Sequence, residues 1–380
     1  MKTIKNHKHI SLKLLVGLSI LILIGILIFG LNPKDYYFTN NFKWITPGTG
    51  IHFGKYSVAH TEPFPEPFKK DISDPNGFSI EIALKPSSYH EEGFNFIFEL
   101  HNGTDRNQLL MGQWRSWIIL MNGDDYDHKR RTKRIAVNTT SSHPTTLFVT
   151  IVTGKNGTEI YVNGRLARTI KDLTLFIPNG NKTRLIIGNS VHGKHSWTGD
   201  VYGLAFYGYT LSAKAAALDF NRWSNRQSFS FAKNNRPFLL YLFDEKGGHE
   251  ALDHSGENHH LKIPSRMQVM SKDILSLPWK GFKLERNLIK DVILNLVGFI
   301  PFGFVLSATF VKGGGRFKKH NILIATVLCF IVSLMIEIVQ AWMPSRSSQM
   351  LDLMLNTLGA FTGAMLFRMI SVVQGKQHVC

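Results

Sequence analysis

The chain has 380 residues, with 44 Lys and Arg against 27 Asp and Glu, and a mean hydropathy of -0.04. Its two cysteines, Cys329 and Cys380, lie near the C-terminus, which excludes a disulfide framework or a thiolate metal site in the rest of the chain. The length accommodates a sizeable soluble domain and a membrane part, and the near-zero hydropathy is an average over very unlike regions.

The first long apolar segment is 14–31, LLVGLSILILIGILIFGL, which carries no charge. It is long enough to cross a hydrocarbon core of roughly 30 Å as a helix. It exceeds the usual apolar core of a signal peptide, and FGLNPKDYY after it offers no small-x-small cleavage site. We therefore expect a retained transmembrane anchor, preceded by a tail at 1–13.

The region 42–270 has the pattern of an all-β domain. Its segments alternate in polarity or are rich in β-branched and aromatic residues, and Asn-Gly pairs such as 156–157 and 163–164 are hairpin signals. Only 212–223 has a helical pattern. Many short strands with little helix predict a sandwich or a barrel. The predicted strands are 77–84, 94–101, 115–122, 146–153, 158–166, 183–189, 200–209 and 238–244.

Three stretches of this region resemble the concanavalin A-like, laminin-G-type jelly roll. They are VTIVTGKNGTEIYVNGRLA (149–167), WTGDVYGLAFYGYTLSAKAA (197–216) and YLFDEKGGHEALDHSGENHHLKI (241–263). The third element usually opens such domains but comes last here, which suggests a permuted strand order. The resemblance implies glycan binding, in some relatives with calcium, and some relatives are glycanases.

Candidate ligand residues in this domain are aromatic or acidic. Trp114, Trp117 and Trp197 can stack on sugar rings, although core or rim packing is the alternative for each. Asp124, Asp125 and Asp127 in NGDDYDH are candidate calcium ligands, and calcium is the only cofactor that the sequence suggests. A retaining glycosidase needs two carboxylates close together, and the chain has no E-x-D-x-E on a strand, so we do not expect hydrolysis here.

Three further apolar segments, 289–311, 321–342 and 351–373, follow a linker at 271–287. They define a membrane domain at 288–373 with a short tail at 374–380. The N-terminal tail and the loop KGGGRFKKH (312–320) are both basic, so both are expected in the cytoplasm. The chain then threads four times, with both termini inside and 32–287 outside.

One layer of the predicted helical bundle collects polar residues. A carboxylate in hydrocarbon costs roughly 2.5–3.5 kcal/mol even on insertion scales, so Glu337 needs a partner or a function. At 1.5 Å per residue, residues from three helices reach the same outer depth as Glu337. Hydrogen-bonded packing is one interpretation of this layer, and a ligand-facing cluster is the other. Its members are Asp291, Asn295, Glu337, Gln340, Arg346, Asp352 and Asn356.

These residues carry a second resemblance, to the VanZ-like membrane family. DVILNLVGFIPFGFVL (291–306) and SLMIEIVQAWMPSRSSQMLDLMLNTLGAFTGAML (333–366) match its pattern, and the outer loop that is ordinarily short in the family here contains the β domain. The resemblance implies the bacterial cell envelope, with a link to glycopeptide antibiotic resistance, and no established reaction.

Two hypotheses follow. The first is a non-enzymatic envelope protein that binds a cell-wall glycan or glycolipid and supports envelope integrity or glycopeptide tolerance. The second is a membrane enzyme acting on a lipid-linked precursor, with Glu337 or Asp352 as general base. A small transporter is disfavoured because four spans leave little room for alternating access.

The charge balance indicates the partners. The region 32–287 has 32 Lys and Arg against 24 Asp and Glu, which favours an anionic envelope polymer or lipid headgroups. Scattered basic residues outside the membrane do not fit nucleic acid. Nothing in the sequence indicates an oligomeric state.

Overall fold

The computed structural model describes residues 11–31, 38–65, 77–139, 143–226, 228–271, 274–277, 286–343, 346 and 348–376. The side chains of 226, 286–291 and 374–376 are not described. Most of the predicted tails, 1–13 and 374–380, and most of the predicted linker lie outside these residues, as does Cys380.

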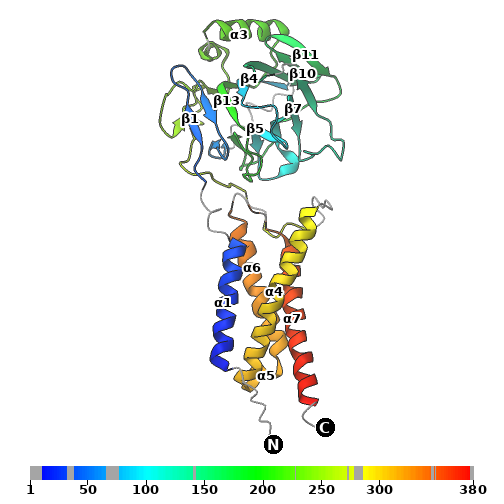
Figure 1. The fold of residues 1–380 in the computed structure, drawn as a ribbon. Helices are drawn as coiled ribbons and strands as arrows, with labels where there is room; N and C mark the ends of the chain where they lie inside the picture. Colours follow the sequence, from blue (N-terminus) through cyan, green and yellow to red (C-terminus); the bar gives the residue numbers. More distant parts are fainter. Residues whose placement is uncertain are drawn as a thin grey trace, which may run out of the picture. The chain divides into compact units, whose positions relative to one another are not determined.

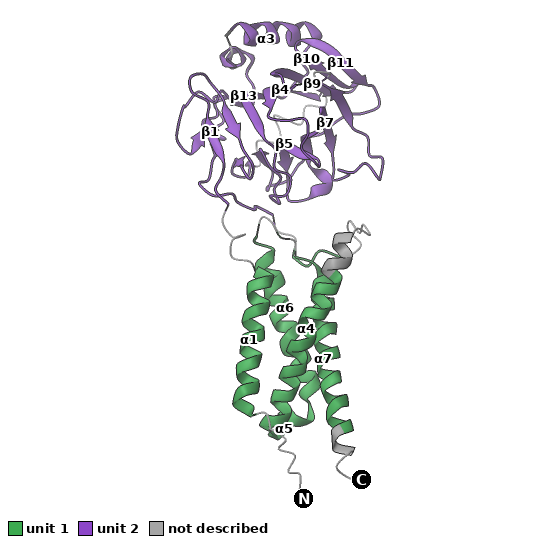
Figure 2. Cartoon of the chain, in the orientation of Figure 1, with its two compact units in different colours: residues 1–36, 272–380 green, residues 37–271 purple. Residues whose placement is uncertain are grey.

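The chain forms two compact units, residues 37–271 and residues 1–36 with 272–380 (Figure 2). The first is a sandwich of two eight-stranded antiparallel sheets, and the second is a group of long helices. This confirms the predicted combination of a membrane α part and an all-β jelly roll.

The first sheet of the sandwich has the order β1-β2-β13-β4-β9-β10-β11, and β14 also pairs with β13 (Figure 1). Its strands are β1 (Phe42–Trp44), β2 (Ile51–Phe53), β4 (Gly77–Pro86), β9 (Leu147–Gly154), β10 (Gly157–Val162), β11 (Arg165–Ile170), β13 (Gly199–Tyr207) and β14 (Leu239–Tyr241).

The second sheet has the order β15-β16-β3-β12-β5-β6-β7-β8. Its strands are β3 (Ala59–His60), β5 (Asn95–His101), β6 (Leu109–Trp114), β7 (Trp117–Asn122), β8 (Ile135–Asn138), β12 (Arg184–Ile187), β15 (Glu250–Ala251) and β16 (Leu261–Lys262). A short 3-10 helix, η2 (Asp105–Asn107), follows β5.

Alternation along the strands builds the core between the sheets. Ile80, Ile82 and Leu84 of β4 face Phe98 and Leu100 of β5 in one buried cluster. The outer face of the first sheet is also buried, because α3 (Ala213–Arg226) and η3 (Ser230–Asn235) pack on it. Both faces of β4 are therefore covered.

Two of the Asn-Gly signals lie at hairpin turns. Asn163 and Gly164 both have positive φ, 51° and 72°, in the turn between β10 and β11, so the strand predicted at 158–166 is in fact two strands. Asn156 and Gly157 lie at the β9–β10 turn. Most of the other predicted strands coincide with β4, β5, β7, β9, β12 and β13, and the predicted helix coincides with α3.

Four helices of the second unit are long and apolar enough to cross a membrane: α1 (Leu12–Leu31), α4 (Arg286–Gly313), α6 (Asn321–Gln340) and α7 (Met350–Lys376). A short helix, α5 (Gly315–Lys319), joins α4 to α6. The chain is thus a membrane protein.

Glycines set the spacing between α4 and α7. A Cβ at Gly359 would lie 2.1 Å from the Leu296 carbonyl oxygen, and one at Gly363 would lie 2.0 Å from that of Ile300. A Cβ at Gly303 of α4 would similarly meet the carbonyl oxygen of Ala360. Only glycine allows the two backbones to approach this closely, which is how small residues promote helix association in membranes.

Candidate functional site

A cavity of about 720 Å³ lies beside the turn that joins β6 to β7. This volume falls within the range of small-molecule sites. Two segments line it, 89–93 before β5 and 114–116 at the hairpin turn. The lining combines Trp114 with the charged or titratable residues His90, Glu91, Glu92 and Arg115, and with Tyr89, Gly93 and Ser116.

Trp114 is the exposed aromatic residue of this cavity. It is 44% exposed, and the Arg115 guanidinium lies 5.2 Å from the centre of its ring. The cation–π contact orients the indole, since a guanidinium over a tryptophan face is attracted by the ring quadrupole. Arg115 reaches this position because it adopts a positive φ of 54° in the two-residue turn.

Gln113 connects both segments of the cavity wall. Its side-chain amide donates to the Ser88 carbonyl oxygen at 2.7 Å and to the Arg115 carbonyl oxygen at 2.8 Å. Its oxygen accepts a hydrogen bond from Trp197 Nε1 at 2.6 Å. Gln113 is buried, so these bonds are shielded from competing water.

The three predicted sugar-stacking tryptophans therefore have different environments. Trp114 lines the cavity, and Trp117 pairs with it across the hairpin and packs against the Phe94 and Phe96 cluster. Trp197 is 0% exposed and lies in the core, so its ring does not face any ligand. The expectation that Trp197 stacks on sugar does not fit this structure, because the ring is buried and its N–H donates to Gln113.

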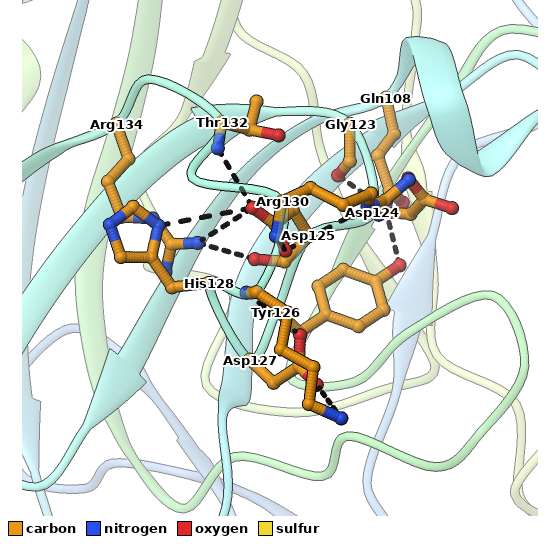
Figure 3. A network of polar contacts seen from close by, with 11 residues as sticks. Gln108, Gly123, Asp124, Asp125, Tyr126, Asp127, His128, Arg130, Thr132 and Arg134 are labelled. Carbon is orange, nitrogen blue, oxygen red and sulfur yellow. Dashed lines mark hydrogen bonds and ion pairs between the residues drawn. The ribbon is translucent and has the colours of Figure 1, made fainter. Parts of the chain in front are cut away.

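The predicted calcium ligands lie in one network of polar contacts in the loop after β7 (Figure 3). The Asp125 carboxylate is 1% exposed and accepts from the backbone N–H groups of Arg130 and Thr132 at 3.1 and 2.9 Å. Those backbone hydrogen bonds outweigh burial and lower the pKa of Asp125. Its role in this structure is to close the loop.

The two neighbouring acids also pair with basic side chains of this loop. Asp124 accepts from Arg130 Nη2 at 2.6 Å, and Asp127 lies 3.0 Å from Lys129 Nζ. Calcium binding at these three residues stays a prediction, and the pairing of all three acids with N–H or basic groups of the same loop does not favour it.

A different cluster has the atoms that a metal ion would need. One ligand atom from each of His101, Asp105 and His192 lies within 4.8 Å of the others. Asp105 Oδ1 is 3.0 Å from His101 Nε2 and 2.9 Å from His192 Nε2. The Gly103 N–H donates to His101 Nδ1, so the proton of that imidazole is on Nε2 and points at Asp105.

This cluster is consequently satisfied by its own hydrogen bonds. Burial opposes ionisation of Asp105, but hydrogen bonds from His101 and His192 outweigh it and hold its pKa well below the ordinary range. Next to it, Glu99 is 0% exposed and accepts from the Val191 N–H. Burial raises the pKa of Glu99 to about 8.

The helical unit has its own polar cluster, in which the described side chains pair. Asn295 Nδ2 donates to Asp352 Oδ1 at 2.7 Å, which joins α4 to α7. Asn356 Nδ2 donates to Ser333 Oγ at 2.9 Å, which joins α7 to α6.

Glu337 and Gln340 complete this layer from α6. Glu337 is 2% exposed and accepts from the backbone N–H of Gln349 at 2.7 Å, and Gln340 Nε2 donates to the Gly30 carbonyl oxygen of α1 at 2.7 Å.

Arg346 lies in the connection between α6 and α7, where its backbone N–H donates to the Met343 carbonyl oxygen at 3.2 Å. Asp291 belongs to α4, but its side chain is outside the described residues.

A short segment before α4 packs on the same connection. Ser276 N–H donates to the Ser348 carbonyl oxygen at 2.9 Å, and Leu275 N–H donates to Ser348 Oγ at 3.0 Å. Ser348 is 1% exposed. Ser276 forms a β-bridge with Gln349, and the Gln349 N–H donates to the Glu337 carboxylate.

Sequence reasoning identified two tryptophans at the hairpin but missed the segment 89–93 and the role of Gln113. The dipeptide Glu91-Glu92 lies in a polar stretch with no periodic pattern, so it gave no local signal. The missing information was the turn that brings Ser88 next to Gln113, 25 positions later in the chain.

The fold and these sites define a membrane protein with a jelly-roll domain of the lectin type. Residues 64–217 match the family model of the concanavalin A-like lectin/glucanases superfamily, and residues 238–371 match that of VanZ/LLP1. The chain therefore combines a VanZ-like membrane domain with a concanavalin A-like domain. The VanZ/LLP1 match begins inside the β unit, at the residue before β14.

Several solved structures are similar over 48% of this chain, all at low identity. A receptor binding domain is 16% identical with a TM-score of 0.39, and the binding domain of botulinum neurotoxin DC in complex with SialylT is 18% identical with a TM-score of 0.38. In both cases the match spans 45% of that chain. The Ruminococcus gnavus IT-sialidase CBM40 is 13% identical over 99% of its length, with a TM-score of 0.35. Comparison with curated proteins gave no match.

Proposed function

We propose that this chain is a carbohydrate-binding protein of the bacterial cell envelope, without catalytic activity. Its proposed sugar site is the cavity beside the β6–β7 turn. The observation that carries the proposal is the exposed Trp114 ring in a cavity of about 720 Å³ lined by polar side chains. An aromatic face packs on the apolar face of a sugar ring, while carboxylate, imidazole and guanidinium groups bind its hydroxyls.

The charges of the lining favour a glycan over a polyanion. Glu91 and Glu92 offset Arg115 and His90, so the cavity has groups of both signs. A polymer of repeated phosphates would meet two carboxylates in this cavity, whereas a hydroxyl-rich sugar finds acceptors and donors. We propose a cell-wall glycan or the sugar portion of a glycolipid as the ligand.

The membrane domain would hold the lectin-like domain at the surface that carries its ligand. With both termini in the cytoplasm, residues 32–287 face the cell wall. Retention of a wall polymer or glycolipid at that place supports a contribution to envelope integrity or glycopeptide tolerance.

Binding of the full-length protein in lipid nanodiscs to soluble cell-wall glycan fragments tests the proposal. Trp114→Ala should weaken binding about tenfold, since the loss of about 1.4 kcal/mol of stacking equals a factor of ten. Phe176→Ala is the matched control, because Phe176 is 48% exposed but does not line the cavity. Equal affinity of the wild type and Trp114→Ala would refute the site.

Trp197→Phe tests whether the hydrogen bond from Trp197 must position Gln113, without changing the Trp114 ring on which the sugar is proposed to stack. It keeps an aromatic ring in the core but removes the N–H that Gln113 accepts, so affinity should fall while the fold is retained. Near-ultraviolet circular dichroism checks the fold. Unchanged affinity would show that Gln113 does not need this support.

A further inference from the structure

A second cavity, of about 310 Å³, lies where the start of α6 meets α7. It is at the end of the helices that carries the basic loop 312–320, and it does not include any residue of the polar cluster. Its lining includes Lys319, His320, Leu323, Thr326, Phe361 and Arg368.

The cavity is lined by basic groups without an acidic one. Lys319, His320 and Arg368 are exposed, and no Asp or Glu occurs in 292–336 or 353–380. The described part of the chain contains no salt bridge from Lys319 or Arg368. The charge of these groups therefore favours an anionic ligand.

Arg368 occupies an unusual place for a charged residue. It lies inside the apolar segment 350–373 that is long enough to span a membrane. Arginine in such a segment is costly unless its guanidinium reaches the headgroup layer, where lipid phosphates can pair with it. A bidentate guanidinium–phosphate pair is among the strong charge-assisted contacts.

The cavity also has exposed apolar side chains in its wall. Leu323 is 63% exposed and Phe361 is 43% exposed, on the same two helices. The Thr326 hydroxyl is buried and has no hydrogen-bond partner among the described residues. The cavity thus offers cations and a hydroxyl for a headgroup, beside an apolar surface for an acyl chain.

We propose that this cavity binds an anionic phospholipid, with its phosphate between Lys319 and Arg368 and its acyl chain along Leu323 and Phe361. Basic pockets between membrane helices recognise anionic lipids in this way. A free phosphate would satisfy the cations but would leave the apolar wall unused. The site is separate from the sugar cavity and does not depend on it.

Native mass spectrometry of the full-length protein in mild detergent tests the proposal with dioctanoyl phosphatidylglycerol, dioctanoyl phosphatidylcholine and inorganic phosphate as separate probes. Phosphatidylglycerol should bind, and phosphatidylcholine should bind more weakly. Arg368→Gln should lower affinity for phosphatidylglycerol about fivefold, because one basic contact contributes about 1 kcal/mol. Arg368→Lys should keep most of the binding, since it keeps the charge.

Lys312→Gln is the matched control, because Lys312 is an exposed basic residue of the same loop region that does not line the cavity. It should leave affinity unchanged. An equal loss in Lys312→Gln would point to diffuse charge and overturn the proposal. So would equal binding of both lipids, unaltered binding in Arg368→Gln, or competition by inorganic phosphate as effective as that by the lipid.

Discussion

Two buried glutamates show how strongly single residues depend on their surroundings. Glu81 of β4 is 0% exposed and accepts hydrogen bonds from Tyr207 Oη at 2.9 Å and Thr150 Oγ1 at 3.2 Å. Glu99 of β5 is equally buried on the outer face of the other sheet. Burial is the main cause that raises the pKa of each to about 8, from an ordinary value of 4.5.

These shifts predict a pH-dependent stability for the β unit. Because the folded-state pKa lies above the unfolded one, this contribution is fully present below about pH 4.5 and is lost as the pH rises through about 8. One pKa unit corresponds to about 1.4 kcal/mol, so the unfolding free energy should fall by several kcal/mol over this window. Urea unfolding of residues 38–271, which have their own core, measures it.

The double variant Glu81→Gln, Glu99→Gln should flatten this dependence, since glutamine does not ionise. Glu62→Gln is the control, because Glu62 is exposed and its hydrogen bond to Lys262 lowers its pKa instead. A wild type with constant stability between about pH 5 and 8 would contradict the assignment.

Substitution of Glu337 in the polar cluster distinguishes a structural role of its carboxylate from a catalytic one. Its carboxylate accepts the Gln349 N–H, and glutamine can accept that hydrogen bond through its amide oxygen. Glu337→Gln should therefore preserve thermal stability in detergent and glycopeptide susceptibility of the cells. Glu337→Ala should lower the unfolding free energy by about 1–3 kcal/mol, because the N–H loses its partner. Loss of the cellular phenotype in Glu337→Gln alone would instead support the membrane-enzyme hypothesis.

At the scale of elements, the contact of α4 with α7 depends on glycine. Gly359→Ala would place a methyl group about 2.1 Å from the Leu296 carbonyl oxygen, so the helices must separate. Overpacking of this kind costs about 1–3 kcal/mol, and the midpoint of thermal unfolding in detergent should fall. Gly298→Ala is the control on α4, since nothing lies within 4 Å of its Cβ. Equal midpoints for the two variants would show that the helices are not in close contact there.

The sequence predicted those elements whose pattern is local. The alternation of Phe78, Ile80 and Ile82 indicated β4, and the long apolar runs indicated the membrane helices. The shortest strands have two or three residues, too few for a period, so β3, β15 and β16 gave no usable signal. These strands exist because neighbouring strands pair with them.

The surroundings that distant segments of the chain give to a side chain could not be predicted from the sequence. Glu81 points away from the core residues of β4, and strand alternation alone places it on a sheet surface, but α3 covers that face. Trp197 and Gln113 meet across 84 positions of sequence. In both cases the tertiary contact, and not the local pattern, decides what the side chain does.

At the scale of the whole molecule, one chain combines a β domain with a membrane domain of long apolar helices. The β unit follows α1, and α4, α6 and α7 follow the β unit, so the jelly roll is an insertion between the first and second membrane helices. The predicted threading has both ends of the inserted domain on one side of the membrane, which makes such an insertion compatible with the membrane fold. The same threading predicts the basic loop 312–320 on the opposite side.

Accessibility to a membrane-impermeant maleimide tests this topology. In a background with Cys380→Ser, a cysteine at Glu257, exposed in the β unit, should react in intact cells. A cysteine at Lys318, exposed in the basic loop, should react only after permeabilisation. Cys329 is 0% exposed and should stay unlabelled in both, which the Cys380→Ser parent checks. The reverse pattern would place the lectin-like domain in the cytoplasm, away from any wall glycan, and would remove the physical basis for the proposed function.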